Sequence, residues 1–200
     1  MTLDIREFHT HFIAIKDVPN HDKWKQYFVS SIDQEIENNS AFASQQKRDL
    51  WAAEFNSNTS YYSQNNSTVD YEQFTEEVVI PILNEVIEEL DFNSYPLKDI
   101  QYWYNRYDKM GMHELHDHLG ADLCLIYLLH LEEPNTTVFH NTMYTQKYFQ
   151  REMYTEDLTE GKIIIFPSHL QHEVQWSDYK RYTIAGNIDL DYEPKISQSD

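Results

Sequence analysis

The stretch Gly111–His118 reads GMHELHDH and carries three histidines, of which His116 and His118 are two positions apart. A second stretch, FPSHLQH, ends at His172 about fifty residues later. Side chains at i and i+2 of a β-strand point to the same side, so an extended Gly111–His118 segment directs His116 and His118 into one cavity. With His172 arriving from a distant strand, three imidazoles can surround one divalent metal. Such a site leaves coordination positions open for catalysis.

Two carboxylates are alternatives to the all-histidine set. Two histidines and one carboxylate on one face of the metal characterise non-haem Fe(II) oxygenases, and the usual His-x-Asp spacing would put that carboxylate where His118 stands. Asp117 points to the other side of an extended strand and becomes a ligand only if the backbone turns locally. Asp122 is a further oxygen ligand that could swing in. Geometry favours His116, His118 and His172, and the ordinary alternative is that these histidines make hydrogen bonds only.

Arg181 and Thr183 belong to a later segment, RYT, and are again two positions apart. A guanidinium is a fixed planar fork that binds a carboxylate through two hydrogen bonds and stays charged. If the segment is a strand, Thr183 places a hydroxyl on the same face, and the two residues can hold one carboxylate together. The alternative is a solvated arginine paired with one of the chain's many acids.

The bulk properties exclude several classes of function. The chain has 200 residues, 40% of them hydrophobic, and a formal net charge of −19. A protein this acidic repels phosphate backbones and anionic lipid. Neither nucleic acid nor a membrane is therefore an expected partner. The sequence has no apolar run of the roughly 18 residues that a membrane span needs, and its start lacks signal-peptide features. We expect one domain over residues 1–200, a cytoplasmic location and a buried, unreactive thiol at Cys124.

Helices are expected in the first half of the chain and strands in the second, which predicts an α+β fold with helices against one face of a sandwich or barrel. A helix is predicted over about 21–38 from the spacing of Trp24, Tyr27, Phe28 and Ile32, and a second from Thr68 or Asp70 to Leu90, kinked at Pro81. The polar tract Asn56–Ser67 is predicted to be a surface loop. Short strands are predicted within Leu3–Ile15, and longer ones at about 100–107, 123–131, 136–140, 161–176 and 181–190.

Taken in order, these residues resemble the iron(II)/2-oxoglutarate-dependent dioxygenases, most closely the small oxygenase group frequent in phages. The resemblance covers about residues 100–190. The residues that carry it are Gly111, His116, His118, Tyr127, Gly161, Phe166–Ser168, His172, Arg181, Thr183 and Asn187.

The resemblance implies a double-stranded β-helix, or jelly roll, over about 96–190, with N-terminal helical support over about 1–95. It implies Fe(II) held by His116, His118 and His172, and 2-oxoglutarate whose 5-carboxylate meets Arg181 and Thr183. In prolyl-hydroxylase-like members a tyrosine that contacts the cosubstrate stands at the position of His113. Further residues expected around the cosubstrate are Tyr107, Tyr127 and Asn187.

The implied reaction is the O2-dependent hydroxylation of a substrate with conversion of 2-oxoglutarate to succinate and CO2. The substrate is expected to be a peptide or protein, or a small metabolite. One alternative is a cupin-like three-histidine dioxygenase that does not use 2-oxoglutarate, and another is a non-catalytic jelly-roll binding protein. The oligomeric state stays open, with a homodimer as one option. If the chain is phage-encoded, its location is the host cytoplasm.

Overall fold

The computed structural model describes residues 12–38, 47–48, 53–61, 67–90, 96–133, 136–141, 152–154 and 158–191. Its helical segments are α1 (His21–Asn38), α2 (Glu72–Phe74), a π-helical turn (Thr75–Val79) and α3 (Ile80–Glu89). Its strands are β1 (Ala14–Asp17), β2 (Lys47–Arg48), β3 (Ala53–Thr59), β4 (Leu97–His116), β5 (Leu123–Leu131), β6 (Thr137–Asn141), β7 (Glu152–Tyr154), β8 (Lys162–Pro167), β9 (His172–Ser177) and β10 (Arg181–Leu190).

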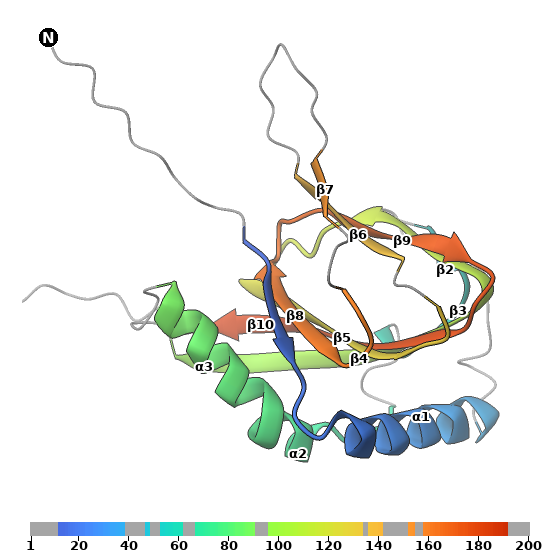
Figure 1. Cartoon of the computed structure of the whole chain (residues 1–200), viewed down its shortest axis with the longest axis horizontal. Coiled ribbons are helices and arrows are strands. Elements are labelled where there is room, and N and C mark those ends of the chain that lie inside the picture. Colours follow the sequence, from blue (N-terminus) through green and yellow to red (C-terminus); the bar gives the residue numbers. More distant parts are fainter. Residues whose placement is uncertain are drawn as a thin grey trace, which may run out of the picture.

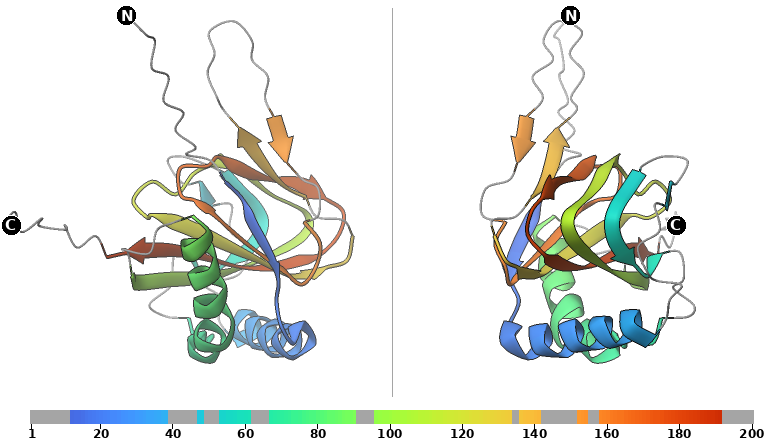
Figure 2. Two further views of the ribbon diagram at one scale, coloured as in Figure 1. Left: turned by 60° about the vertical axis from the view of Figure 1, so that its left-hand side comes forward. Right: turned by 90° about the vertical axis from the view of Figure 1, so that its right-hand side faces the viewer.

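The strands form one curled antiparallel sheet (Figure 1). Its order is β1-β8-β5-β10-β4-β9-β6-β7, and β3 also pairs with β4 while β2 pairs with β3. Figure 2 shows that the sheet folds over on itself, so that β9 and β6 face the layer made by β5, β10 and the first half of β4. The candidate site lies between these two layers.

The long strand β4 makes this fold possible because it belongs to both layers. Its first part pairs with β10, from Leu97 to Tyr107, and its last part pairs with β9, from Gly111 to His116. Between these two parts of β4, Met110 has a positive φ of 63°. The register of β4 with β9 then shifts twice, between Gly111 and His113 and between His113 and His116. Such irregularities bend a strand and increase its twist. The bend carries the histidine-rich end of β4 over the β10 layer.

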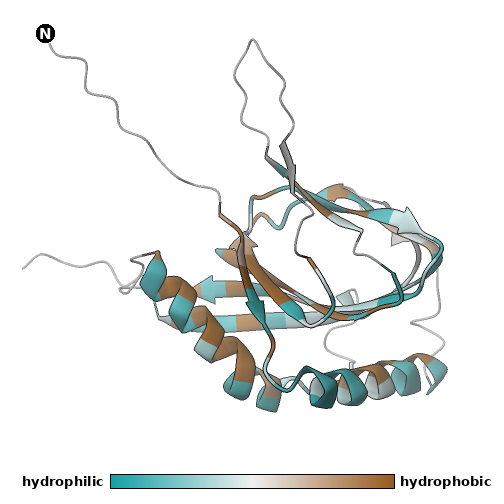
Figure 3. Ribbon diagram, viewed as in Figure 1, coloured by the Kyte–Doolittle hydropathy of each residue, from teal (hydrophilic) through white to brown (hydrophobic). Residues whose placement is uncertain are grey.

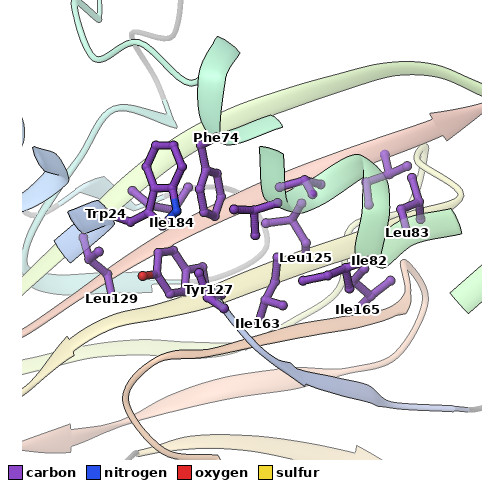
Figure 4. Packing of buried hydrophobic residues seen from close by; sticks show 14 of the residues in the cluster. Trp24, Phe74, Ile82, Leu83, Leu125, Tyr127, Leu129, Ile163, Ile165 and Ile184 are labelled. Atoms are coloured by element: carbon purple, nitrogen blue, oxygen red, sulfur yellow. The ribbon is translucent and has the colours of Figure 1, made fainter. Parts of the chain in front are cut away.

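The helices α1 and α3 cover the outer face of the β5–β10–β8 layer (Figures 1 and 2). Apolar side chains from the helices meet those from the sheet in one buried cluster, part of which is shown in Figure 4. Trp24, Phe74 and Leu83 come from the helical segments, and Tyr127 and Ile184 come from the sheet. In Figure 3 the apolar positions form one stripe along each helix, as expected for a helix with one buried face. Strand alternation then turns the remaining residues of β5 and β10 towards the cavity.

Most of the predicted elements are confirmed. The helix over 21–38, the strand over 123–131 and the strand over 181–190 have the predicted ends. The segment 161–176 contains two strands, β8 and β9, and the strand predicted over 100–107 continues to His116. The part of the Leu3–Ile15 prediction that precedes Phe12 lies outside the described residues.

Four details of the prediction are wrong. Tyr27 is 41% exposed and is not part of the buried face of α1, because its hydroxyl donates to the Asp70 carbonyl at the surface. The tract from Asn56 is not a loop at its start: β3 runs to Thr59, and Ser57 to Ser60 are buried. The second helix is not one regular α-helix: it changes to a π-helical turn over Thr75–Val79, and Pro81 stands in the first turn of α3 directly after it. The helical support predicted over about 1–95 also contains β2 and β3, which join the sheet, whereas β1 agrees in part with the strand predicted within Leu3–Ile15.

Among the helices of the described residues, none combines the length and the apolar character that crossing a membrane requires.

Candidate metal centre

Three imidazoles converge at one end of the cavity between the layers. His116 is the last residue of β4, His118 follows it, and His172 is the first residue of β9, where its backbone pairs with that of His116. The nitrogen atoms that these residues offer all lie within 4.8 Å of one another. The ring centroids of His172 lie 4.2 Å from those of His116 and 5.2 Å from those of His118. Strand pairing therefore brings together three ligands from two distant segments.

Hydrogen bonds to backbone carbonyls fix two of these rings. Nδ1 of His116 lies 2.7 Å from the Glu114 carbonyl oxygen, and Nδ1 of His172 lies 3.1 Å from that of Leu170. A carbonyl only accepts, so each Nδ1 carries the proton and each Nε2 keeps a free electron pair. Histidine ligands are commonly oriented in this way.

Burial keeps the rings in the neutral form that binds metal. It lowers the pKa of His118 to about 3, and lowers the pKa values of His116 and His172 as well. The neighbouring imidazoles lower the pKa values of His118 and His172 further. A neutral imidazole suits Fe, Zn, Cu and Ni. The donor set therefore fits a divalent transition metal.

A fourth histidine, His113, lies against this group. Its ring stacks on that of His116 with centroids 3.8 Å apart, and it also lines the cavity. Burial lowers its pKa, and the positive charge of Arg181 adds to this effect. His113 thus lies between the three converging histidines and the buried arginine.

Arg181 is a buried cation that pairs with no anion in the part of the chain that the structure describes. Only 4% of its surface is exposed, and its NH1 and NH2 groups donate to the hydroxyls of Thr136 and Thr137 at 2.7 and 3.0 Å. Its guanidinium lies 4.9 Å from the ring centroid of Tyr107. Within the described part of the chain, its Nε has no hydrogen-bond partner and no carboxylate pairs with the group. Burial lowers the pKa of Arg181 to about 10, so it remains charged at neutral pH.

The cavity that holds these groups has a volume of about 800 Å³. Alternate residues of β10 form one wall, beginning with Arg181 and Thr183 and ending with Asn187 and Asp189. The paired strand β4 adds Tyr107 opposite Arg181, then Asn105 and Trp103. The ring of Trp103 lies 5.5 Å from that of His118. Three neutral imidazoles and a deeper cation thus face one space large enough for a small ligand.

The structure brings most of the predicted site residues together around the cavity. His113, Tyr107, Thr183 and Asn187 line it with the three histidines and Arg181. Asp117 also lines it, but does not belong to the group of three converging ligands.

Two predicted residues lie elsewhere. The hydroxyl of Tyr127 is 2.6 Å from Nδ1 of His21 and its ring stacks on Phe74, so Tyr127 belongs to the core beneath the helices and does not line the cavity. The alternation of β5 explains this, since Cys124 and Ile126 face the cavity and Tyr127 faces the helices. Asp122 accepts a hydrogen bond of 2.7 Å from the Leu190 amide. It holds the end of β10 and is outside the cavity lining.

The sequence prediction missed Asn105 and the threonine pair Thr136 and Thr137. Asn105 alternates with Tyr107, so the period of two along this strand could have revealed it. The threonines could not be found in this way, because their contact with Arg181 depends on the position of β6.

No protein-family model matches the chain. An alignment 83 positions long, which covers 38% of the chain, shows 32% identity to the aspartate carbamoyltransferase catalytic subunit of Lactobacillus acidophilus. This match spans 26% of that protein's length and does not place the chain in a family.

Solved structures show the fold. A prolyl-4-hydroxylase of Pseudomonas putida matches 90% of this chain and 93% of its own, with a TM-score of 0.61 and 12% identity. A Trichoplax adhaerens prolyl hydroxylase, solved with a hypoxia inducible factor peptide, matches 88% of this chain and 83% of its own, with a TM-score of 0.62 and 11% identity. The non-haem α-ketoglutarate-dependent carbocyclase SnoK from nogalamycin biosynthesis matches 95% of this chain and 85% of its own, with a TM-score of 0.63 and 7% identity. The chain therefore shares the fold of 2-oxoglutarate and Fe(II) oxygenases.

Proposed function

We propose that this protein is a non-haem Fe(II)/2-oxoglutarate-dependent oxygenase that hydroxylates its substrate with release of succinate and CO2. The observation that carries the proposal is the pairing of two features in one cavity. One is the group of three neutral imidazoles, and the other is the buried Arg181, which pairs with no carboxylate among the residues that the structure describes. Leaving a charge buried and unpaired is unfavourable, so such a cation indicates an anionic ligand.

His116, His118 and His172 would hold the metal through their Nε2 atoms or, for His118, through either ring nitrogen. Bound Fe(II) would supply the activation of O2 that couples decarboxylation of 2-oxoglutarate to oxidation of a substrate C–H bond. Arg181 and Thr183 would bind the 5-carboxylate, with Tyr107 against the guanidinium and His113 beside it. Asn187 lies further out on the same wall, towards the substrate.

Charge explains why a dicarboxylate fits this cavity. Three neutral ligands leave the full charge of +2 on a divalent metal, and Arg181 adds one more positive charge. 2-Oxoglutarate carries two negative charges and places one near each cation. A monocarboxylate would leave either the metal or Arg181 unbalanced in a buried space.

The curled sheet is proposed to be a double-stranded β-helix, supported by the N-terminal helices, and residues 1–200 are proposed to act as one domain in the cytoplasm. Two of the structural neighbours are prolyl hydroxylases, which favours a peptide or protein as substrate over a small metabolite. We also propose that the protein is related to the phage-type oxygenase group, and the order of the motifs in the sequence supports this link.

Anaerobic titration tests the proposal. Protein loaded with Co(II) should bind 2-oxoglutarate, and protein with Fe(II) and ascorbate should form succinate from it under air. Succinate formation should stop when His172 is replaced by glutamine and persist when the exposed His169 is replaced in the same way. The proposal fails if the purified protein binds neither the metal nor 2-oxoglutarate.

A three-histidine dioxygenase that binds its substrate directly to the metal is the second candidate. The lack of a carboxylate in the ligand group of the described residues favours it. Oxygen consumption that does not depend on added 2-oxoglutarate would select this alternative.

A further inference from the structure

The outer part of the cavity differs in charge from its inner part. Of the described residues that line the cavity, Arg181 is the only lysine or arginine, and Asp117 and Asp189 are the only acids. Arg181 and Asp189 are the first and the last cavity-facing residues of β10, eight positions apart. At roughly 3.3 Å per residue they are separated by up to about 26 Å along the strand. The wall therefore runs from a cation at one end to a carboxylate at the other.

Asp117 stands in sequence between His116 and His118 and lines the same cavity as Asp189. The charge of Asp117 acts on Cys124, and the Cys124 thiol donates a weak hydrogen bond of 3.5 Å to Asn187, two positions before Asp189. Within the described part of the chain, neither Asp117 nor Asp189 has a hydrogen-bond or ion-pair partner, and both are partly buried. Two partly buried carboxylates without a cation favour a positively charged ligand group.

Two aromatic side chains line the cavity between its Arg181 end and its Asp189 end. Trp103 stands opposite Ala185 in the strand register, midway between Arg181 and Asp189. Tyr61 lines the same cavity and meets the Trp103 ring edge-on, with centroids 5.1 Å apart. Aromatic rings close to carboxylates are a favourable surrounding for ammonium groups because ring faces attract cations. The overall charge of −19 also raises the local concentration of cations.

We propose that the outer part of the cavity binds a positively charged nitrogen of the substrate, held by Asp117 and Asp189 and flanked by Trp103 and Tyr61. The inference rests on the proposed function and adds the chemical class of the substrate. If 2-oxoglutarate lies between Arg181 and the histidines, the part of the cavity beside Trp103, whose ring is 5.5 Å from that of His118, would remain for the substrate. A substrate held by its charged nitrogen at Asp189 therefore presents a carbon some bonds away from that nitrogen for oxidation.

The test compares three probes of similar size, n-butylammonium, 1-butanol and butanoate. Each is titrated by NMR into protein loaded with Co(II) and 2-oxoglutarate, so that Arg181 is occupied. We expect n-butylammonium to bind more tightly than 1-butanol, and butanoate to bind least. Asp189→Asn should weaken n-butylammonium binding about fivefold, which corresponds to the loss of one partly exposed ion pair. Asp191→Asn is the matched control, because Asp191 is exposed and outside the cavity lining, and it should have no effect.

Equal binding of the three probes, or preference for butanoate, would overturn the inference. So would an ammonium preference that Asp189→Asn leaves unchanged. The wild-type comparison of n-butylammonium with 1-butanol keeps its meaning even if the variant fails to fold. Binding of Co(II) and 2-oxoglutarate is measured first. If neither binds, the proposed function is overturned. The comparison of n-butylammonium with 1-butanol does not involve Arg181, so it still decides whether the ammonium subsite exists.

A second set of probes distinguishes the two sources of such a nitrogen. A lysine-containing peptide with blocked termini is compared with n-butylammonium in the same loaded protein. Tighter binding of the peptide than of the same peptide with norleucine in place of lysine indicates a protein substrate. Equal binding of the lysine and norleucine peptides, together with binding of n-butylammonium, indicates a small amine.

Discussion

Replacing Arg181 with methionine should weaken 2-oxoglutarate binding without unfolding the protein. Burial lowers the pKa of Arg181 from 12.5 to about 10, and at about 1.4 kcal/mol per pKa unit the buried charge costs about 3 kcal/mol. Methionine removes this cost and keeps an apolar side chain of similar length. It also removes the hydrogen bonds to Thr136 and Thr137, worth about 1 kcal/mol each. The two effects largely cancel, so the free energy of unfolding without ligand should change by no more than about 1 to 2 kcal/mol.

The bound state should respond very differently. A carboxylate held by Arg181 would lose a buried, charged hydrogen-bonding partner, which costs about 2 to 5 kcal/mol. A loss of about 3 kcal/mol corresponds to roughly 100-fold weaker binding. Isothermal titration of 2-oxoglutarate into the Co(II) protein measures this change, and urea unfolding of the ligand-free protein measures stability.

Arg106→Met is the matched control. Arg106 already has anionic partners, since its guanidinium lies 3.2 Å from Asp33 and 3.1 Å from Asp108, near the surface. Its loss should lower the free energy of unfolding by about 1 kcal/mol and leave the affinity for 2-oxoglutarate unchanged. The reasoning is refuted if Arg181→Met destabilises the protein by more than about 2 kcal/mol while 2-oxoglutarate binds as it does to the wild type.

Three more outcomes follow from the structure. His172→Gln should weaken Co(II) binding by more than about 100-fold because one of the three proposed ligands is lost. The visible absorption of Co(II) measures this binding, and His169→Gln should leave it unchanged. Leu83→Ala, at a fully buried position in the helix layer, should lower the free energy of urea unfolding by about 2 to 5 kcal/mol and leave Co(II) affinity intact; an unchanged unfolding midpoint would contradict the packing described. Burial lowers the pKa values of His118 and His172 below the 6.5 of an exposed histidine, so below about pH 6.5 the unfolded chain binds more protons than the folded one. The metal-free protein should therefore be fully stabilised above that pH and lose stability as pH falls from 6.5 to 5, and flat stability over this range would count against neutral, buried histidines.

The convergence of His116 and His118 could be predicted from sequence because strand geometry has a short period. The two histidines are two positions apart, and any extended backbone puts them on one side. The same rule gave Arg181 and Thr183 a common face, and the structure brings both to the cavity. The arrival of His172 beside His116 is not a local property. It depends on the pairing of β4 with β9, for which the sequence contains only the order of the motifs.

Tyr127 shows where the same rule needs more information. β5 is apolar on both faces, and a continuous apolar strand does not reveal which face meets the helices. Its register with β10 decides the matter: Tyr127 lies opposite Ile184, which faces the helix layer. Similarly, Ser57, Asn58 and Thr59 are polar residues that resemble a loop, yet they are buried in β3 because their neighbours in β4 supply partners for the backbone. In both cases the pairing partner, which lies far away in sequence, determines the environment.

The replacement of a carboxylate by His118 changes the charge of the centre and leaves the cavity with a compensating acid. A set of two histidines and one carboxylate would reduce the charge of a divalent metal to +1, whereas the three neutral histidines leave it at +2. Asp117, the residue before His118, is outside the ligand group but lines the same cavity and acts electrostatically on His116. A carboxylate thus lies near the proposed metal position but outside the ligand group, where it would offset part of the extra charge and would be available to a cationic substrate. Removing that carboxylate, by Asp117→Asn, should therefore strengthen the binding of anions at the metal and weaken the binding of ammonium probes in the same protein.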